Sequence, residues 1–119
     1  MGKRVLVCGS RDWDDEATME AEFDKLPPDT VIIEGEQRGA DLMAKKLATR
    51  RNMAVLPFAA EWTKYGNSAG PIRNQRMLEE GHPDLVLAFP LPASRGTWDM
   101  VNRAKKAGVE TCVVKRRQP

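Results

Sequence analysis

The sequence predicts an α/β fold in which a five-stranded parallel sheet is covered by helices on both faces. Along the chain, five short apolar runs alternate with four segments of helical periodicity, which is the pattern of strands joined by crossover helices. The runs are continuously apolar, as expected for parallel strands that are buried on both faces. Because such crossovers are right-handed, few topologies remain. We expect the strand order 3-2-1-4-5, with the flavodoxin-like order 2-1-3-4-5 as the alternative.

The first half of the chain carries three predicted strands and two predicted helices. Residues 4–8 form the first apolar run, and the helix after it has Asp14 and Asp15 as candidate caps. Pro27 and Pro28 end that helix. Residues 30–34 and 53–58 predict the second and third strands. Between them, a helix is indicated by an apolar stripe at Ala40, Met43, Ala44, Leu47 and Ala48.

The second half supplies the remaining elements. Residues 59–69 are expected to form a longer loop, and a third helix begins at Gly70-Pro71 and runs to about Glu80. Residues 84–89 predict the fourth strand, and a helix over residues 96–107 ends at Gly108. Residues 110–114 predict the last strand, and residues 115–119 form a basic tail that is expected to be solvated and frayed.

Length and composition limit the class of protein. The chain has 119 residues, 41% of them hydrophobic and 30% charged, with a formal net charge of +2. We expect one globular domain over residues 1–119, located in the cytoplasm, because no apolar run approaches the roughly 20 residues of a membrane span. The single histidine and the two cysteines are too scattered for a metal site, so no metal or cofactor is expected. Both cysteines lie in strand-like runs and are expected to be buried, reduced thiols.

An anion-binding loop is predicted after the fourth strand. There the chain passes through Ser94-Arg95-Gly96-Thr97 into a helix. The first turn of a helix presents unpaired backbone N–H groups and the positive end of the helix dipole, and both attract phosphate. The hydroxyl groups of Ser94 and Thr97 add donors, and Gly96 lets a ligand approach the backbone closely.

Other basic and glycine residues gather at the same edge of the predicted sheet. The carboxyl ends of the strands, where ligands bind in such sheets, are followed by four arginines and five glycines: Arg11, Arg38, Arg73, Arg95, Gly9, Gly35, Gly39, Gly70 and Gly96. Guanidinium groups and exposed backbone amides both match phosphate oxygens. Neither a G-x-G-x-x-G nor a G-x-x-x-x-G-K-[ST] motif is present, which disfavours a dehydrogenase and a P-loop ATPase.

Three residues near this edge have two interpretations each. Glu34, at the end of the second strand, is either an acceptor for ribose hydroxyls or a solvated edge charge. Asp41 either caps its own helix or holds Arg38 or Arg73 in place. Trp62 either anchors its loop in the core, which we favour, or stacks on a base.

Four ordered motifs, which run through most of the chain from about Val5 to Val114, resemble the YspA-like branch of the SLOG superfamily. They are Gly9-Ser10-Arg11-Asp12, Gly35-x-x-Arg38-Gly39-Ala40-Asp41, Trp62-x-x-Tyr65-Gly66 with Arg73-Asn74-x-x-Met77, and Ser94-x-Gly96-Thr97-x-Asp99. The superfamily is named for the DNA-processing protein DprA and the Lonely Guy enzymes. The resemblance implies a Rossmann-like three-layer sandwich that binds a nucleotide or a nucleotide-derived ligand, with ADP-ribose or NAD-related molecules as the usual suggestion. It also implies a possible homodimer or higher homo-oligomer.

The resemblance to the Lonely Guy enzymes, which cleave nucleoside monophosphates, is incomplete. Their phosphate loop reads P-G-G-x-G-T-x-x-E, and this chain keeps Pro92, Gly96 and Thr97 but has Met100 in place of the glutamate. Asp99 lies one residue early, which turns its side chain by about 100 degrees on a helix. Glycosidic cleavage needs a carboxylate near the developing positive charge. The candidate catalytic residues are therefore Asp99, Glu36 and Arg73.

The leading hypothesis is a module that binds a nucleotide-like small molecule. The expected ligand-binding residues are Gly9, Ser10, Arg11, Asp12, Gly35, Arg38, Gly39, Ala40, Asp41, Trp62, Arg73, Asn74, Met77, Ser94, Arg95, Gly96 and Thr97. The first alternative is a nucleotide N-glycosidase (a phosphoribohydrolase) of Lonely Guy type. The second is a DprA-like nucleic-acid binder that uses the basic residues Lys45, Lys46, Arg50 and Arg51. The nearly neutral net charge disfavours a nucleic-acid partner.

Overall fold

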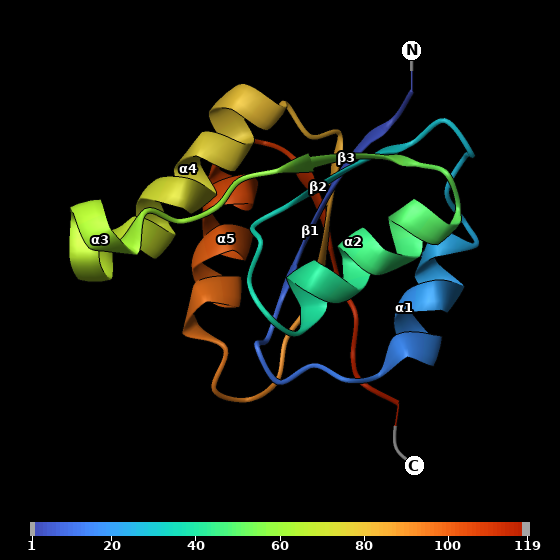
Figure 1. Ribbon diagram of the computed structural model, residues 1–119, viewed down its shortest axis with the longest axis horizontal. Coiled ribbons are helices and arrows are strands. Elements are labelled where there is room, and N and C mark those ends of the chain that lie inside the picture. The colour runs from blue at the N-terminus through green and yellow to red at the C-terminus, as the bar shows by residue number, and fades with distance from the viewer. Residues whose placement is uncertain (1, 118–119) are drawn as a thin grey trace.

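The computed structural model describes residues 2–117 and contains one five-stranded sheet in the order β3-β2-β1-β4-β5. This confirms the preferred strand order. All neighbouring strands are parallel. The strands are β1 (Arg4–Gly9), β2 (Val31–Glu34), β3 (Ala54–Pro57), β4 (Leu85–Phe89) and β5 (Glu110–Val113) (Figure 1).

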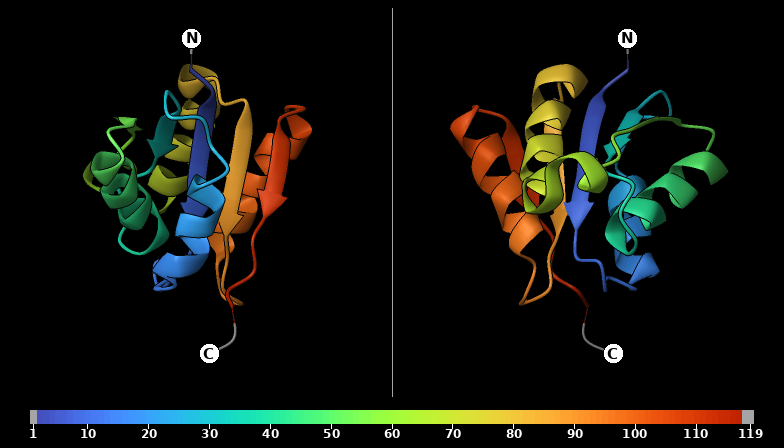
Figure 2. Two further views of the ribbon diagram at one scale, coloured as in Figure 1. Left: turned by 90° about the vertical axis from the view of Figure 1, so that its right-hand side faces the viewer. Right: turned by 60° about the vertical axis from the view of Figure 1, so that its left-hand side comes forward.

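Helices cover both faces of the sheet, so the molecule is the expected Rossmann-like three-layer sandwich (Figures 1 and 2). The side chains of β1 alternate between the two faces: Val5 and Val7 belong to one core cluster, and Leu6 and Cys8 belong to the other. The first cluster is completed by α1 (Glu16–Phe23) and α2 (Ala40–Arg50), and the second by α4 (Ala69–Gly81) and α5 (Arg95–Lys106). The central strands β1 and β4 are therefore buried on both faces, which explains their unbroken apolar runs.

A crevice forms at the edge of the sheet where the helices that follow two neighbouring strands cover opposite faces. After β1 the chain enters α1 on one face, whereas after β4 it enters α5 on the other face. The two strands are neighbours, with Gly9 paired in register with Phe89. Their following loops therefore diverge and leave a crevice at the carboxyl end of the sheet. The Ser10 amide donates to the Phe89 carbonyl at 3.0 Å, and the Ala40 amide donates to the Ser10 carbonyl at 3.0 Å.

The segment between β3 and α4 differs from the expected loop. It contains a short helix, α3 (Trp62–Tyr65), and a 3₁₀ turn (Gly66–Ser68), and α4 begins at Ala69. The favoured interpretation of Trp62 as a core anchor is wrong, because its side chain is 44% exposed. The physical reason is that α4 and α5 already fill this face of the sheet, while α3 projects from the body of the molecule (Figure 1).

Two smaller expectations also need correction. Cys8 is buried, but Cys112 lies on the edge strand β5 and is exposed. The basic tail is not free up to residue 117, because Arg116 forms an ion pair with Asp14 at 2.8 Å and the Arg117 amide donates to Asp15 at 3.0 Å. Residues 118–119 lie outside the described residues. Among residues 2–117, none of the helices is both long and apolar enough to cross a bilayer.

We expect Gly9→Ala to lower the free energy of unfolding by about 2 kcal/mol. A Cβ at Gly9 would lie 2.5 Å from Ala40 Cβ and 2.6 Å from the Phe89 carbonyl oxygen, where β1, β4 and α2 meet. Gly96→Ala is the matched control, because a Cβ there meets nothing within 4 Å and alanine favours a helix. Urea unfolding measures the free energy of unfolding of both variants. Equal values for the two variants would contradict the packing described at Gly9.

Candidate ligand-binding site

A cavity of about 670 Å³ opens at the carboxyl ends of β1 and β4. Its walls come from the loops after β1, β2 and β4, from α3, from α4 as far as Met77 and from the start of α5. The predicted site residues that line it are Gly9, Ser10, Arg11, Asp12, Arg38, Asp41, Trp62, Arg73, Asn74, Met77, Ser94, Arg95, Gly96 and Thr97. Sequence reasoning missed further lining residues, among them Gln37, Pro71 and Leu91.

Three predicted site residues do not line the cavity but shape the loops behind it. A Cβ at Gly35 would lie 2.6 Å from Nη1 of Arg73, so this glycine allows the loop after β2 to contact the guanidinium group. Gly39 has φ +82, and a side chain there would collide with the Ser10 carbonyl oxygen. Ala40 donates its amide to that same carbonyl. These residues therefore bring the loops after β1 and β2 together.

The first turn of α5 forms one corner of the cavity. Among residues 2–117, the backbone amides of Gly96 and Thr97 donate to no acceptor, as is usual at a helix start. A Cβ at Gly96 would meet nothing within 4 Å, so the chain's own packing does not explain the glycine. The Ser94 hydroxyl accepts from the Leu91 amide at 2.9 Å and so fixes the loop before the helix. The corner leaves unpaired amides beside open space.

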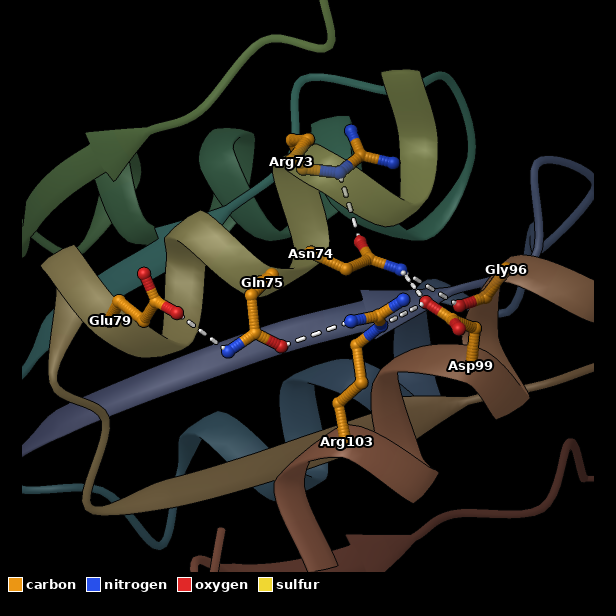
Figure 3. Close-up of polar contacts among 7 residues, drawn as sticks. All are labelled: Arg73, Asn74, Gln75, Glu79, Gly96, Asp99 and Arg103. Carbon is orange, nitrogen blue, oxygen red and sulfur yellow. Dashed lines mark hydrogen bonds and ion pairs between the residues drawn. The ribbon is translucent and has the colours of Figure 1, made fainter. Parts of the chain in front are cut away.

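Arg73 and Asn74 of α4 connect this corner to the loop after β2. Arg73 is 8% exposed, and its Nη1 donates to the Gly35 carbonyl at 2.6 Å while its Nε donates to Asn74 Oδ1 at 3.0 Å. Asn74 Nδ2 in turn donates to Asp99 Oδ2 at 3.0 Å and to the Gly96 carbonyl at 3.3 Å (Figure 3). The hydrogen bonds to Gly35 and Asn74 thus fix the Arg73 side chain at the cavity wall.

The two candidate catalytic acids are engaged in ion pairs. Asp99 lines the cavity, but its Oδ2 also accepts from Arg103 Nε at 2.8 Å (Figure 3). Glu36 does not line the cavity; it has φ 60 and pairs with Lys45 at 2.9 Å. Glu36 therefore lies outside the cavity in which a catalytic acid would have to act.

Asp41 is the buried carboxyl group of the cavity wall. It is 6% exposed, and its Oδ2 accepts from the Gln37 amide at 3.4 Å. Burial raises the pKa of Asp41 to about 7, and the nearby charge of Arg73 opposes that rise. Of its two possible arginine partners, Arg38 instead pairs with Asp12 at 3.5 Å. Asp41 thus supports the loop after β2 and lies beside Arg73.

Glu34 is fully buried, so the interpretation as a solvated edge charge is wrong. Its Oε1 accepts from the Glu36 amide at 2.7 Å, while Oε2 is buried without a partner among the described residues. Burial, together with the neighbouring Glu36, raises the pKa of Glu34 to about 8. Glu34 is behind the wall and does not line the cavity. Because of this raised pKa, the Glu34 carboxyl group is mostly neutral near pH 7.

Arg11 and Trp62 meet at the mouth of the cavity. The guanidinium carbon of Arg11 lies 5.7 Å from the centre of the Trp62 ring, which is within cation–π range. Trp13, in contrast, is a core residue that packs edge-on against Phe89 at 5.2 Å between ring centres. Trp98 is 42% exposed and lies outside this cavity.

Two arginines that line the cavity have no acid partner. Within residues 2–117, Arg11 and Arg95 have no carboxylate within 4.0 Å. On α2 and at its C-cap, by comparison, every basic residue is paired with an acid: Lys45 with Glu36, Lys46 and Arg50 with Glu16, and Arg51 with Asp24. The positive charges of the α2 face are therefore neutralised by neighbouring carboxylates.

Comparisons with known proteins agree on the class of this chain. The family model of the YspA, cpYpsA-related SLOG family matches residues 3–65. The Gene 61 protein of Mycobacterium phage D29 is 37% identical over 116 residues, which cover 90% of this chain and 92% of that protein. The X-ray structure of DNA processing protein A (DprA) from Streptococcus pneumoniae is similar, with a TM-score of 0.52 and 17% identity over 93% of this chain. The match spans 58% of the DprA chain, and at this identity it shows the fold alone.

We expect the buried Glu34 to make the protein less stable as the pH rises. The pKa of Glu34 is about 8 in the folded chain against an ordinary 4.5, so the folded chain holds this proton more tightly than the unfolded chain does. The contribution of Glu34 to the free energy of unfolding is therefore complete below pH 4.5 and is lost as the pH rises toward 8. In the Glu34→Gln variant, the free energy of unfolding should fall by about 1–3 kcal/mol less over this pH range than in the wild type. Chemical unfolding between pH 5 and 8.5 measures it, and parallel pH profiles for the two proteins would contradict the assignment.

Proposed function

The chain belongs to the YspA, cpYpsA-related SLOG family, and we propose that it binds a nucleotide or nucleotide-derived ligand in the cavity beyond β1 and β4. One observation carries the proposal. Gly96 and Thr97, whose amides have no acceptor among residues 2–117, line the same cavity as Arg11 and Arg95, whose guanidinium groups have no acid partner there. Amides and free arginines that converge on a cavity suit a phosphate group.

In this proposal the phosphate binds at the first turn of α5. The Gly96 and Thr97 amides donate to its oxygens, and the helix dipole favours its negative charge. The open space at Gly96 allows the close approach. Arg95 neutralises the phosphate from the mouth, while Arg73, fixed by Gly35 and Asn74, supplies positive charge from the wall.

The remainder of the ligand is a ring and a sugar. Trp62 and Arg11 offer a stacking surface at the mouth, and nucleobases stack well on such groups. Asp12 lines the cavity and offers carboxylate oxygens for ribose hydroxyls. The volume of about 670 Å³ falls in the range of small-molecule sites. A nucleoside monophosphate, ADP-ribose or NAD has the right combination of charge and rings.

One observation favours a second candidate, cleavage of an N-glycosidic bond. Asp41 lines the cavity, and its pKa of about 7 suits a group that exchanges protons near neutral pH. Asp99 and Glu36 are less suited because each is engaged by a basic side chain. Nucleic-acid binding through α2 gains no support, because its basic residues are all paired.

We expect Arg95→Ala to weaken ADP-ribose binding about tenfold, because it removes an unpaired guanidinium group from the phosphate. Arg50→Ala is the matched control: the same charge is lost, but from the α2 face outside the cavity. Isothermal calorimetry of ADP-ribose and AMP measures both. Equal affinities for the two variants, or a wild-type protein that binds neither compound, would refute the site.

We expect the affinity for ADP-ribose to fall several-fold as the pH rises from 6 to 8. Asp41, with its pKa of about 7, becomes negatively charged near Arg73 and offsets the positive charge that Arg73 supplies to the phosphates. The diphosphate of ADP-ribose does not titrate in this range. Asp41→Asn should flatten the profile, whereas Asp12→Asn, an exposed lining acid, should retain it. Chromatography of the same samples decides the second candidate: free base released by the wild type but not by Asp41→Asn would establish cleavage.

A further inference from the structure

A second hollow adjoins the cavity on the other side of the loop that precedes α5. It has a volume of about 610 Å³ and is formed by residues 92–95 together with Trp98, Asp99 and Asn102. Residues 92–95 and Asp99 also line the main cavity. The two hollows therefore adjoin at this loop, and an elongated molecule that crosses the loop would reach both.

Arg95 lies at the boundary between the hollows. It lines both of them, it is exposed, and no carboxylate of the described residues lies within 4.0 Å of it. A ligand that passes from one hollow to the other therefore meets a free positive charge midway. The group that suits this position is an anionic bridge, such as a phosphodiester or a diphosphate.

Trp98 gives the second hollow an aromatic wall. Its side chain is 42% exposed, although a large apolar ring is normally mostly buried. It lies three residues after Arg95 on α5, so both side chains share one face of the helix. Asn102, one turn further, is exposed and lines the same hollow, where its amide can pair with the polar edge of a ring. This combination suits a nucleobase or a nicotinamide.

We propose, resting on the proposed function, that the ligand is of the dinucleotide class, with two ring-bearing units joined by an anionic bridge. The first unit occupies the main cavity at Trp62, the bridge crosses Arg95, and the second ring stacks on Trp98. Trp98 then determines specificity: it distinguishes a two-ring ligand from a mononucleotide, because only the former reaches the second hollow.

The test compares NAD with AMP in calorimetric titrations of the wild type and of Trp98→Ala. Loss of one stacked ring should weaken NAD binding about tenfold and leave AMP binding unchanged. Leu42→Ala is the control, because Leu42 is comparably exposed at 41% but lies on α2, away from both hollows. This variant should leave both affinities unchanged.

The outcomes separate this proposal from the proposed function. If the wild type binds AMP and NAD and Trp98→Ala binds NAD equally well, the second subsite is overturned and the first site stands. If the wild type binds neither compound, both fall. A second copy of the chain could also cover Trp98, and sedimentation of the same proteins tests this alternative. If Trp98→Ala changes self-association but leaves the NAD affinity unchanged, this surface is an interface between copies and the proposal is overturned.

Discussion

The pairing of β1 with β4 is the constraint on which the rest of this structure depends. The two strands are hydrogen-bonded neighbours, yet their following helices cover opposite faces of the sheet. Their loops must therefore separate, and the separation creates the cavity. The hydrogen bond from the Ser10 amide to Phe89 fixes the point of separation. Gly9 permits it, because α2 and β4 leave no room for a side chain.

Electrostatics then distinguishes this cavity from the α2 face. Positive charge on α2 is neutralised locally, while Arg11 and Arg95 keep unpaired guanidinium groups at the cavity mouth. Asp41 in the cavity wall and Glu34 behind it have raised pKa values and so carry less negative charge than two ordinary carboxylates. The consequence is a cavity that favours an anion despite a net charge of only +2 for the whole chain.

The sequence was sufficient to predict the strand order and the place of the loops, because unbroken apolar runs and right-handed crossovers leave few alternatives. It was also sufficient to collect most of the residues that line the cavity. It could not predict the burial of Glu34, since a carboxylate at the end of a short strand looks like an edge charge until the neighbouring elements are known. The exposure of Trp62 and Cys112 was missed for the same reason: burial depends on whether another element covers the position. Periodicity alone does not contain that information.

The most direct test of the central claim is an NMR titration of the backbone amides with ADP-ribose. The account predicts that the largest chemical-shift changes fall on Gly96 and Thr97 and on residues 10–12, where amides would meet phosphate and ribose. Amides of α2 from Lys45 to Arg50 should barely move, because that face is already paired. Largest changes on α2, or none anywhere at millimolar ligand, would contradict the account.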